Sequence, residues 1–369
     1  MSDDRIEKLA DVLVRYSIAA RPGDKVAVMG EVAAAPLIRA VYAKVLQAGG
    51  HPYVHVALPG MEELFYRYAS DEQLQHISGP ARLVVETYDA RIWIGAEENT
   101  KALSGVDSAK MVLQRRAHTD MMKTFMRRSA SGEFRWVSTL YPTNAYAQDA
   151  EMSLDEYEDF VYGACLTDMD DPVGAWQRLS ARQQKAADWL KGKERVHVIG
   201  PETDLRLSVA GRTFINSDGH HNMPCGELFT GPIEDSVEGQ VAFSFPAVTE
   251  GREVTGVRLR FEHGKVVEAS AEKNEAFLLQ MLDTDEGARR VGEFAIGTND
   301  GITRFTRQIL FDEKIGGSFH MAVGAGYPET GSRNESSVHW DMICDLRQGG
   351  EIWVDDELFY HNGQFVVEF

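Results

Sequence analysis

Two stretches near the C-terminus carry imidazole side chains, and one of them also carries a carboxylate. One of them runs Ser336-Ser337-Val338-His339-Trp340-Asp341, in which polar and apolar residues alternate as in a β-strand. Successive strand side chains point to opposite faces, so His339 and Asp341 lie on one side, about 6.5–7 Å apart along the backbone. That spacing suits two ligands of one metal centre, although a surface strand can carry the same motif for solubility.

A third candidate ligand, His320, lies in an apolar stretch bounded by glycines, residues 315–327. A histidine in such a strand is either hydrogen-bonded within the core or bound to a metal ion. His320, His339 and Asp341 fall within about 22 positions of one another. Because borderline metals prefer sets of imidazole and carboxylate ligands, this grouping favours the metal interpretation.

Two glutamates extend the set. Glu227 lies in a loop rich in turn-forming residues, from which a carboxylate can project into a cleft. Glu293 is embedded among apolar residues, and a buried carboxylate without a partner is costly. A metal ion or a base must offset that cost, and Arg289 or Arg290 could supply the base. The residues alone leave both alternatives open.

Helices and strands must position the candidate ligands. In the first half of the chain, helical and strand patterns alternate. Apolar residues at helical spacing predict helices over about residues 6–14 and 33–47. Short apolar runs predict buried strands at residues 25–29, 51–58 and 90–96. Since strands that alternate with helices form parallel sheets with crossover helices, we expect a parallel sheet here.

The pattern changes after a helical stretch that ends at Leu190. From Arg195 onward, short strand-like runs separated by turns predict hairpins and a mainly antiparallel sheet. We therefore expect an α/β protein of two domains. Residues 1–193 would form an N-terminal α/β domain with a largely parallel sheet, and residues 194–369 a C-terminal α+β domain dominated by antiparallel strands. The second domain contains every candidate ligand.

The composition argues against several classes of function. Lys and Arg total 38 against 57 for Asp and Glu, a formal net charge of -19 that disfavours nucleic acid and anionic membranes as partners. Residues 30–35, after the first expected strand, lack the glycine spacing of dinucleotide-binding loops. No stretch has the apolar length of a membrane span, and the N-terminus does not resemble a signal peptide. With only three cysteines, we expect a cytoplasmic protein with reduced thiols.

Four segments of the C-terminal half contain the candidate ligands within longer motifs. They are Pro-Cys-Gly-Glu-Leu-Phe-Thr-Gly-Pro (224–232), Gly-Glu-Phe-Ala-Ile-Gly-Thr-Asn (292–299), the Phe-His strand that leads to Gly-Tyr (319–327) and Ser-Val-His-Trp-Asp (337–341). These motifs, in this order, resemble those of one known enzyme family, the M29 aminopeptidases of the aminopeptidase T group. The resemblance covers essentially the whole chain and is most specific after about residue 215.

The resemblance implies a metal-dependent aminopeptidase that hydrolyses the N-terminal bond of peptides through a water activated by two metal ions. It implies two divalent ions per subunit, zinc, cobalt or manganese, and a homodimer. Glu293 would bridge the ions or assist proton transfer, and Tyr327 would donate a hydrogen bond to the oxyanion. Three carboxylates against four positive charges leave a residual charge that favours a bound hydroxide. The implied metal ligands are Glu227, Glu293, His320, His339 and Asp341.

Two other interpretations of the same residues remain. Ring-cleaving dioxygenases of dihydroxypyridines are similar to this family and use one Fe(II), which His320, His339 and Asp341 could hold as a facial triad. Glu227 and Glu293 would then have no role, which favours the two-metal site. The third interpretation is a non-catalytic protein that captures a cation or an amine.

Overall fold

The computed structural model describes residues 3–249 and 251–369. The chain forms two compact units, one of residues 1–176 and 219–224, the other of residues 177–218 and 225–369. The expected fold class is confirmed, because the first unit contains a parallel sheet with helices and the second contains antiparallel sheets. The chain passes from the first unit into the second within helix α10 (Pro172–Leu190).

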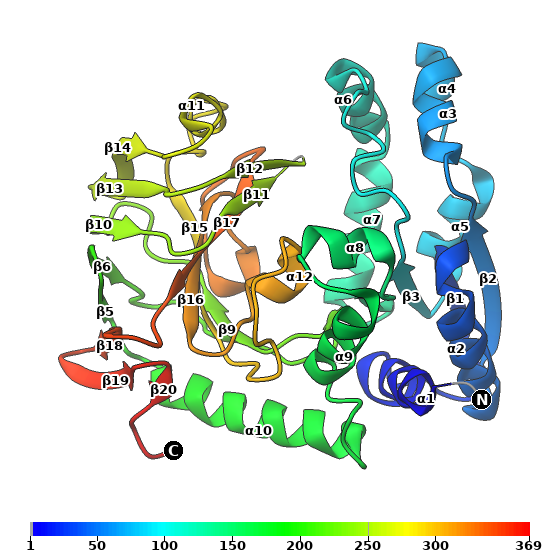
Figure 1. The fold of residues 1–369 in the computed structure, drawn as a ribbon, viewed down its shortest axis with the longest axis horizontal. Helices are drawn as coiled ribbons and strands as arrows, with labels where there is room; N and C mark the ends of the chain where they lie inside the picture. Colours follow the sequence, from blue (N-terminus) through cyan, green and yellow to red (C-terminus); the bar gives the residue numbers. More distant parts are fainter. Residues whose placement is uncertain (1–2, 250) are drawn as a thin grey trace. The chain divides into compact units, whose positions relative to one another are not determined.

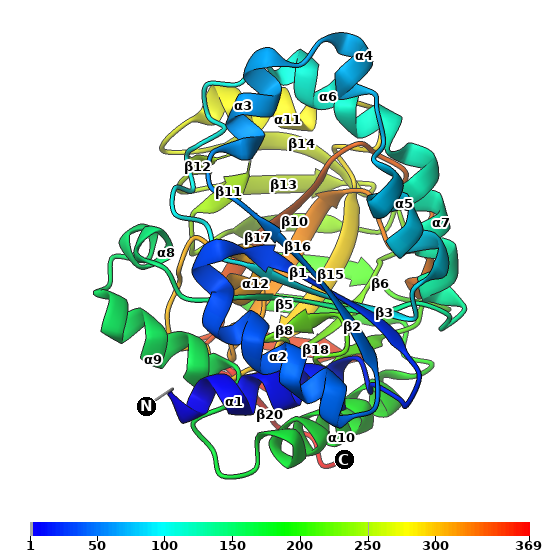
Figure 2. The same ribbon diagram turned by 90° about the vertical axis from the view of Figure 1, so that its right-hand side faces the viewer.

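The first unit is a five-stranded parallel sheet with helices on both faces (Figure 2). In β1 (Lys25–Glu31), Ala27 faces a cluster with residues of α5 (Gly79–Thr87) and α7 (Thr119–Ala130). Gly30 faces the other side, where a Cβ atom would lie 3.3 Å from Ile38 of α2 (Ala35–Gln47). The strand order is β2 (His51–Ala57), β1 (Lys25–Glu31), β3 (Ala90–Gly95), β4 (Arg135–Leu140) and β8 (Asn222–Met223).

Helices occupy most of the chain between these strands, as the alternating sequence pattern predicts. They are α1 (Asp4–Asp11), which continues as a π-helical turn (Val12–Ser17), a 3-10 turn (Val32–Ala34), α2 (Ala35–Gln47), α3 (Met61–Tyr68), α4 (Asp71–Leu74), α5 (Gly79–Thr87), α6 (Ser108–Ala117), α7 (Thr119–Ala130), α8 (Asn144–Asp149) and α9 (Leu154–Ala164).

The second unit is built on two larger antiparallel sheets and a short hairpin (Figure 1). The eight-stranded sheet has the order β14 (Lys265–Ser270), β13 (Arg258–Glu262), β10 (Glu238–Ala242), β6 (Thr203–Ser208), β5 (Arg195–Gly200), β18 (Glu351–Val354), β19 (Glu357–His361) and β20 (Gln364–Phe365). The five-stranded sheet has the order β17 (His339–Asp345), β16 (Ser318–Gly324), β15 (Val291–Gly297), β9 (Glu227–Thr230) and β7 (Ile215–Ser217). The hairpin pairs β11 (Ala247–Thr249) with β12 (Arg252–Val254).

The five-stranded sheet turns one face to the core of this unit. Because strand side chains alternate, every second residue of β15, β16 and β17 joins one apolar cluster with residues of the eight-stranded sheet. The intervening residues face the other way and include four of the candidate ligands, and the fifth, Glu227, begins the neighbouring strand β9. The residues of the core face include Leu228, Val291, Phe294, Ile296, Phe319, Met321, Val323, Trp340, Met342 and Cys344.

Short helical segments complete the second unit, namely α11 (Glu275–Leu282), α12 (Ile309–Asp312) and a 3-10 turn (Pro328–Thr330). Helix α10 packs Ala186, Ala187 and Leu190 into the same apolar cluster. Within the described residues, none of the helices has both the length and the apolar character needed to cross a bilayer.

Asp285 fixes the segment that leads into β17. Its carboxylate accepts hydrogen bonds at 2.7 Å from the Ser336 hydroxyl and from both the backbone amide and the hydroxyl of Ser337. It also accepts bonds from the amides of Gly287 and Ala288. Partial burial raises the pKa of Asp285, but these hydrogen bonds outweigh it and lower the pKa to about 2. The ionised carboxylate thus holds the start of the strand that carries two candidate ligands.

The substitution Asp285→Asn is expected to destabilise the protein in a pH-dependent way. Since the folded-state pKa of about 2 lies below the ordinary value of 3.8, the stabilisation is present above that value and disappears as the pH falls through 2. We expect a loss of about 1 kcal/mol in the free energy of unfolding near neutral pH. Urea unfolding between about pH 3 and pH 7 measures it. If the difference in unfolding free energy between the variant and wild type grew as the pH fell, the role of Asp285 would be contradicted. The substitution Glu286→Gln, at an exposed neighbouring residue, is the control.

Candidate metal centre

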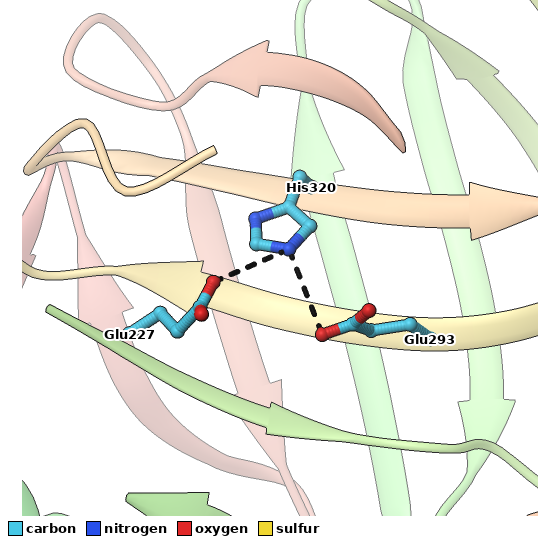
Figure 3. Close-up of side chains that lie close together, drawn as sticks. All are labelled: Glu227, Glu293 and His320. Atoms are coloured by element: carbon cyan, nitrogen blue, oxygen red, sulfur yellow. Dashed lines mark ion pairs between the residues drawn. The ribbon is translucent and has the colours of Figure 1, made fainter. Parts of the chain in front are cut away.

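Five side chains on one face of the five-stranded sheet converge on a small volume. Glu227 begins β9, Glu293 lies in β15, His320 in β16, and His339 and Asp341 in β17. Figure 3 shows Glu227, Glu293 and His320 pointing toward one another from three neighbouring strands. The five residues, which span about 115 positions of the sequence, are therefore neighbours in space.

Glu293 lies between two halves of this cluster. His320 Nε2 is 3.8 Å from one carboxylate oxygen of Glu293 and 3.5 Å from Glu227 Oε2. His339 Nε2 is 3.3 Å from the other oxygen of Glu293 and 3.6 Å from Asp341 Oδ2. Glu293 thus belongs to two three-residue groups whose candidate ligand atoms lie within 4.8 Å of one another. A carboxylate in this position is suited to bridge two cations.

Small residues lie opposite the converging side chains. Ala322 is paired with Glu293 on one side and with Asp341 on the other, and Ala295 is paired with His320. Directly opposed residues in a sheet have their Cβ atoms about 4.5–5.5 Å apart, so larger side chains here would fill the space between the ligands. The sheet register therefore leaves room at the centre of the cluster.

The orientation of His339 leaves one ring nitrogen available as a ligand. Its Nδ1 lies 2.8 Å from the carbonyl oxygen of Ala325, which can only accept, so Nδ1 carries the proton. Nε2 faces Glu293 and Asp341, and in the neutral form of the ring it is the nitrogen whose lone pair can bind a cation. This is the tautomer that backbone carbonyls usually enforce on metal-binding histidines. The His339 side chain is 28% exposed whereas that of His320 is 1% exposed, so the cluster opens at His339.

Neighbouring backbone contacts support Glu227. The buried side chain of Gln183, from α10, donates to the carbonyl oxygens of Ser217 and Glu227 and accepts a bond from the Thr298 hydroxyl. The amide of Thr298 in turn donates to the carbonyl of Gly226. The backbone at the first residue of β9 is thereby held from both sides, which fixes the point from which the Glu227 carboxylate projects.

A further acidic residue, Glu313, belongs to the cluster and was not predicted from the sequence. One of its carboxylate oxygens lies within 4.8 Å of ligand atoms of His320 and Asp341. Its neighbour Lys314 is fully buried, contacts the Glu313 carboxylate and lies 3.8 Å from Glu227 Oε1. Glu313 and Lys314 directly follow α12, and Lys314 immediately precedes the apolar stretch, residues 315–327, in which His320 was predicted as a ligand. In a chain with 57 acidic residues, nothing in the spacing of Glu313 distinguishes it.

Burial and neighbouring charges act in opposite directions on these groups. Burial raises the pKa of Glu293, but its interactions with His320 and His339 outweigh burial and lower the pKa to about 2. Burial lowers the pKa of His339, but Glu293 and Asp341 outweigh it and raise the pKa to about 9. For Glu227 burial prevails over Lys314 and His320 and raises the pKa. The buried carboxylates therefore attract positive charge, either from an imidazolium or from a bound cation.

The unsatisfied atoms of the cluster fit a metal centre. Among the described residues, Glu227 Oε2 and Asp341 Oδ1 are buried and have no hydrogen-bond partner. Buried polar atoms are normally paired, so each such atom requires an explanation. Carboxylate oxygens and neutral imidazole nitrogens are the ligands that zinc, cobalt and manganese accept. The residues present thus fit divalent cations.

Comparison with known proteins identifies the family of the chain. Residues 2–365 match the family of thermophilic metalloproteases called M29. The chain belongs to the M29 family. Two relatives are aminopeptidase T of Thermus thermophilus, 28% identical over 92% of this chain and 91% of the relative, and aminopeptidase 2 of Geobacillus stearothermophilus, 26% identical over 92% of both.

Solved structures agree with this assignment. The structure of AmpT from Thermus thermophilus superposes with a TM-score of 0.85 at 26% identity, over 98% of this chain and 99% of that one. A 2,5-dihydroxypyridine dioxygenase from Pseudomonas putida KT2440 superposes with a TM-score of 0.57 at 13% identity, over 99% of this chain and 97% of that one. The second similarity shows a shared fold and carries no information on the reaction.

In this M29 chain, the alternative that Arg289 or Arg290 offsets the buried charge of Glu293 is wrong. Arg289 pairs with Asp283 at 2.7 Å, and Arg290 donates to the carbonyl oxygen of Glu234. The basic groups beside Glu293 are instead the imidazoles of His320 and His339.

Tyr327, the other predicted active-site residue, lies beside the cluster. Its ring contacts the rings of His339 and Phe229, with centroids 5.1 and 5.4 Å away. Burial, reinforced by the charges of Glu293, Asp341 and Glu227, raises the pKa of Tyr327. Its hydroxyl is therefore protonated at neutral pH and can donate a hydrogen bond. The roles of Tyr327 and of the five candidate ligands remain predictions.

Divalent cations are expected to stabilise this M29 chain, because they bind the folded cluster and relieve repulsion between its carboxylates. At a free cation concentration 100 times the dissociation constant, the stabilisation is about 2.7 kcal/mol. Thermal unfolding of chelator-stripped protein with and without cobalt or manganese measures it.

Glu227→Gln should reduce this shift in melting temperature, whereas the exposed Glu286→Gln should retain it in full. An equal shift in wild type and the Glu227 variant would mean that the cations bind elsewhere.

Proposed function

We propose that this chain is a metal-dependent aminopeptidase that removes N-terminal residues from peptides. Membership of the M29 family supports a metalloprotease, and the relatives named aminopeptidase support an exopeptidase. The observation that carries the proposal is the position of Glu293, whose two oxygens face two different imidazoles. This arrangement provides two adjacent ligand groups rather than one.

The proposed centre takes two divalent ions of zinc, cobalt or manganese. Glu227 and His320 would hold one ion, His339 and Asp341 the other, and Glu293 would bind both. Glu313 is added as a further donor on the side of His320 and Asp341, because its carboxylate lies within 4.8 Å of their ligand atoms. Such ions, when bound, supply Lewis acidity and lower the pKa of water to about 7.

The chain's own residues have distinct tasks in this reaction. The carbonyl oxygen of Ala325 fixes the His339 ring, and Gln183 fixes the backbone of Glu227. The protonated Tyr327 hydroxyl would donate a hydrogen bond to the oxygen that becomes negative when the peptide carbonyl is attacked. Because the cluster opens at His339, the substrate would enter from that end with its free N-terminus foremost.

Three finer features belong to the same proposal. Residues 1–193 and 194–369 would act as separate domains, the second carrying catalysis. The cytoplasm is the proposed location, which the free cysteines Cys165, Cys225 and Cys344 support. A homodimer is proposed on the family resemblance, and light scattering of the purified protein would test it.

Metal content and peptidase activity together test the proposed reaction. Protein stripped with a chelator and reloaded should contain two zinc, cobalt or manganese ions per chain and release the chromophore from aminoacyl anilides. Glu293→Gln should reduce turnover at least about 10³-fold, because the bridging carboxylate is lost.

An N-acetylated anilide controls for the need for a free amine and should not react. One iron per chain with ring cleavage of a dihydroxypyridine would favour the dioxygenase interpretation instead. Substantial turnover by a folded, metal-loaded Glu293 variant would remove that residue from the mechanism.

Tyr327→Phe tests stabilisation of the oxyanion separately from metal binding. The variant should keep its metal content and a nearly unchanged KM, while kcat falls by about 10²–10³-fold, the usual cost of one lost oxyanion donor. Steady-state kinetics on an aminoacyl anilide measure both constants. The exposed Tyr53→Phe is the matched control. An unchanged kcat would show that Tyr327 is a core residue beside the site.

A further inference from the structure

Lys314 is a fully buried lysine in the second unit, with no exposed side-chain surface. Lysine is among the residues that are almost never fully buried unless paired, because removal of an ammonium group from water is energetically costly. Its Nζ atom contacts the Glu313 carboxylate and lies 3.8 Å from Glu227 Oε1. Both partners belong to the cluster described above, so the ammonium group faces the proposed metal centre and not solvent.

The contacts of Lys314 leave the inward oxygen of Glu227 free. Lys314 approaches Oε1 of Glu227, whereas Oε2 faces His320 at 3.5 Å. This oxygen is also the one without a hydrogen-bond partner among the described residues. An ammonium group on the outer oxygen thus directs the inner oxygen toward the cluster.

The backbone around Lys314 is fixed against the sheet. Its carbonyl oxygen accepts a bond from the amide of Asn299, which follows β15 closely. Gly297, paired with Glu227 across the sheet, has no side chain, and a Cβ atom there would lie 2.3 Å from the carbonyl oxygen of Ile315. The glycine lets the chain after α12 lie directly on β15, so Lys314 reaches Glu227 from a rigid support.

Charge balance gives Lys314 a second effect. Glu227, Glu293, Glu313 and Asp341 bring four negative charges into a mostly buried volume, and Lys314 brings one positive charge. Two divalent ions with the carboxylates of Glu227, Glu293 and Asp341 have a net charge of plus one. The lysine cancels the charge of Glu313, so this net charge is unchanged when Glu313 is included. Without the lysine, Glu227 and Glu313 would repel each other in a region of low dielectric constant.

We propose that Lys314 is a positioning residue of the metal centre, whose ammonium group holds Glu227 and Glu313 in the orientation that binds divalent cations. The proposal rests on the proposed function, since it requires that the cluster binds metal. It differs from a purely structural ion pair in one measurable respect. A structural pair affects only the stability of the fold, whereas a positioning residue changes the affinity for metal.

The test is a metal titration of the full-length chain after removal of bound ions. Lys314→Met keeps the length and the apolar stem of the side chain but removes the ammonium group. We expect at least one of the cobalt-binding steps, measured by competition with a chromophoric chelator, to weaken tenfold or more, which equals about 1.4 kcal/mol. The absorption spectrum of bound cobalt should also change, because the Glu227 carboxylate is no longer fixed.

Two further variants separate charge from folding effects. Lys185→Met removes an exposed lysine of α10 and should leave both binding steps unchanged. If Lys314→Met alone does not fold, the double variant Lys314→Met/Glu313→Gln is used, in which neither partner of the pair is charged. Its cobalt affinity is compared with that of Glu313→Gln alone. We then expect at least a threefold loss of cobalt affinity from the lysine substitution, acting through Glu227.

The outcomes distinguish the two proposals. If wild-type protein binds cobalt and the Lys314 variants bind it with unchanged affinity and spectrum, the positioning role is overturned, even when their melting temperature falls. If wild-type protein binds no divalent cation at all, the proposed metal centre itself is wrong.

Discussion

The alternation of side chains along β-strands is the constraint on which the second unit depends. In β15, β16 and β17, one set of residues enters the apolar core, and the residues between them carry carboxylates and imidazoles on the opposite face. A shift of register by one residue in any strand would exchange the two sets, burying Glu293 or His320 in the core and exposing Phe294 or Phe319. The packing of the core therefore also fixes the geometry of the polar cluster.

That cluster gathers more negative charge than a protein interior normally tolerates. Two histidines and one lysine lie among its four carboxylates, and several of its buried oxygens have no partner among the described residues. Each of these features is unfavourable for folding alone. Together they indicate that this region contributes less to the stability of the fold than an apolar core would, which is typical of functional sites.

Much of this arrangement could be predicted from the sequence, and the limits are physical. The spacing of His339 and Asp341 fixed their common face, because the strand period is two residues. The alternating patterns of the N-terminal half gave its parallel sheet, but not β4 (Arg135–Leu140) or the two-residue β8. Glu313 and Lys314 were missed because they approach the cluster from a loop. Their position depends on Gly297 and on how the chain after α12 lies on β15, and neither follows from local periodicity.

The alanines that separate the polar side chains have a consequence for how this scaffold can diverge. Ala322 contributes a single methyl group between Glu293 and Asp341, and Ala295 does the same beside His320. A bulkier residue at either position would fill the space between the candidate ligands, so these two positions tolerate little variation. The rim around His339 and Tyr327 is more open, and side chains there can vary without narrowing the interior.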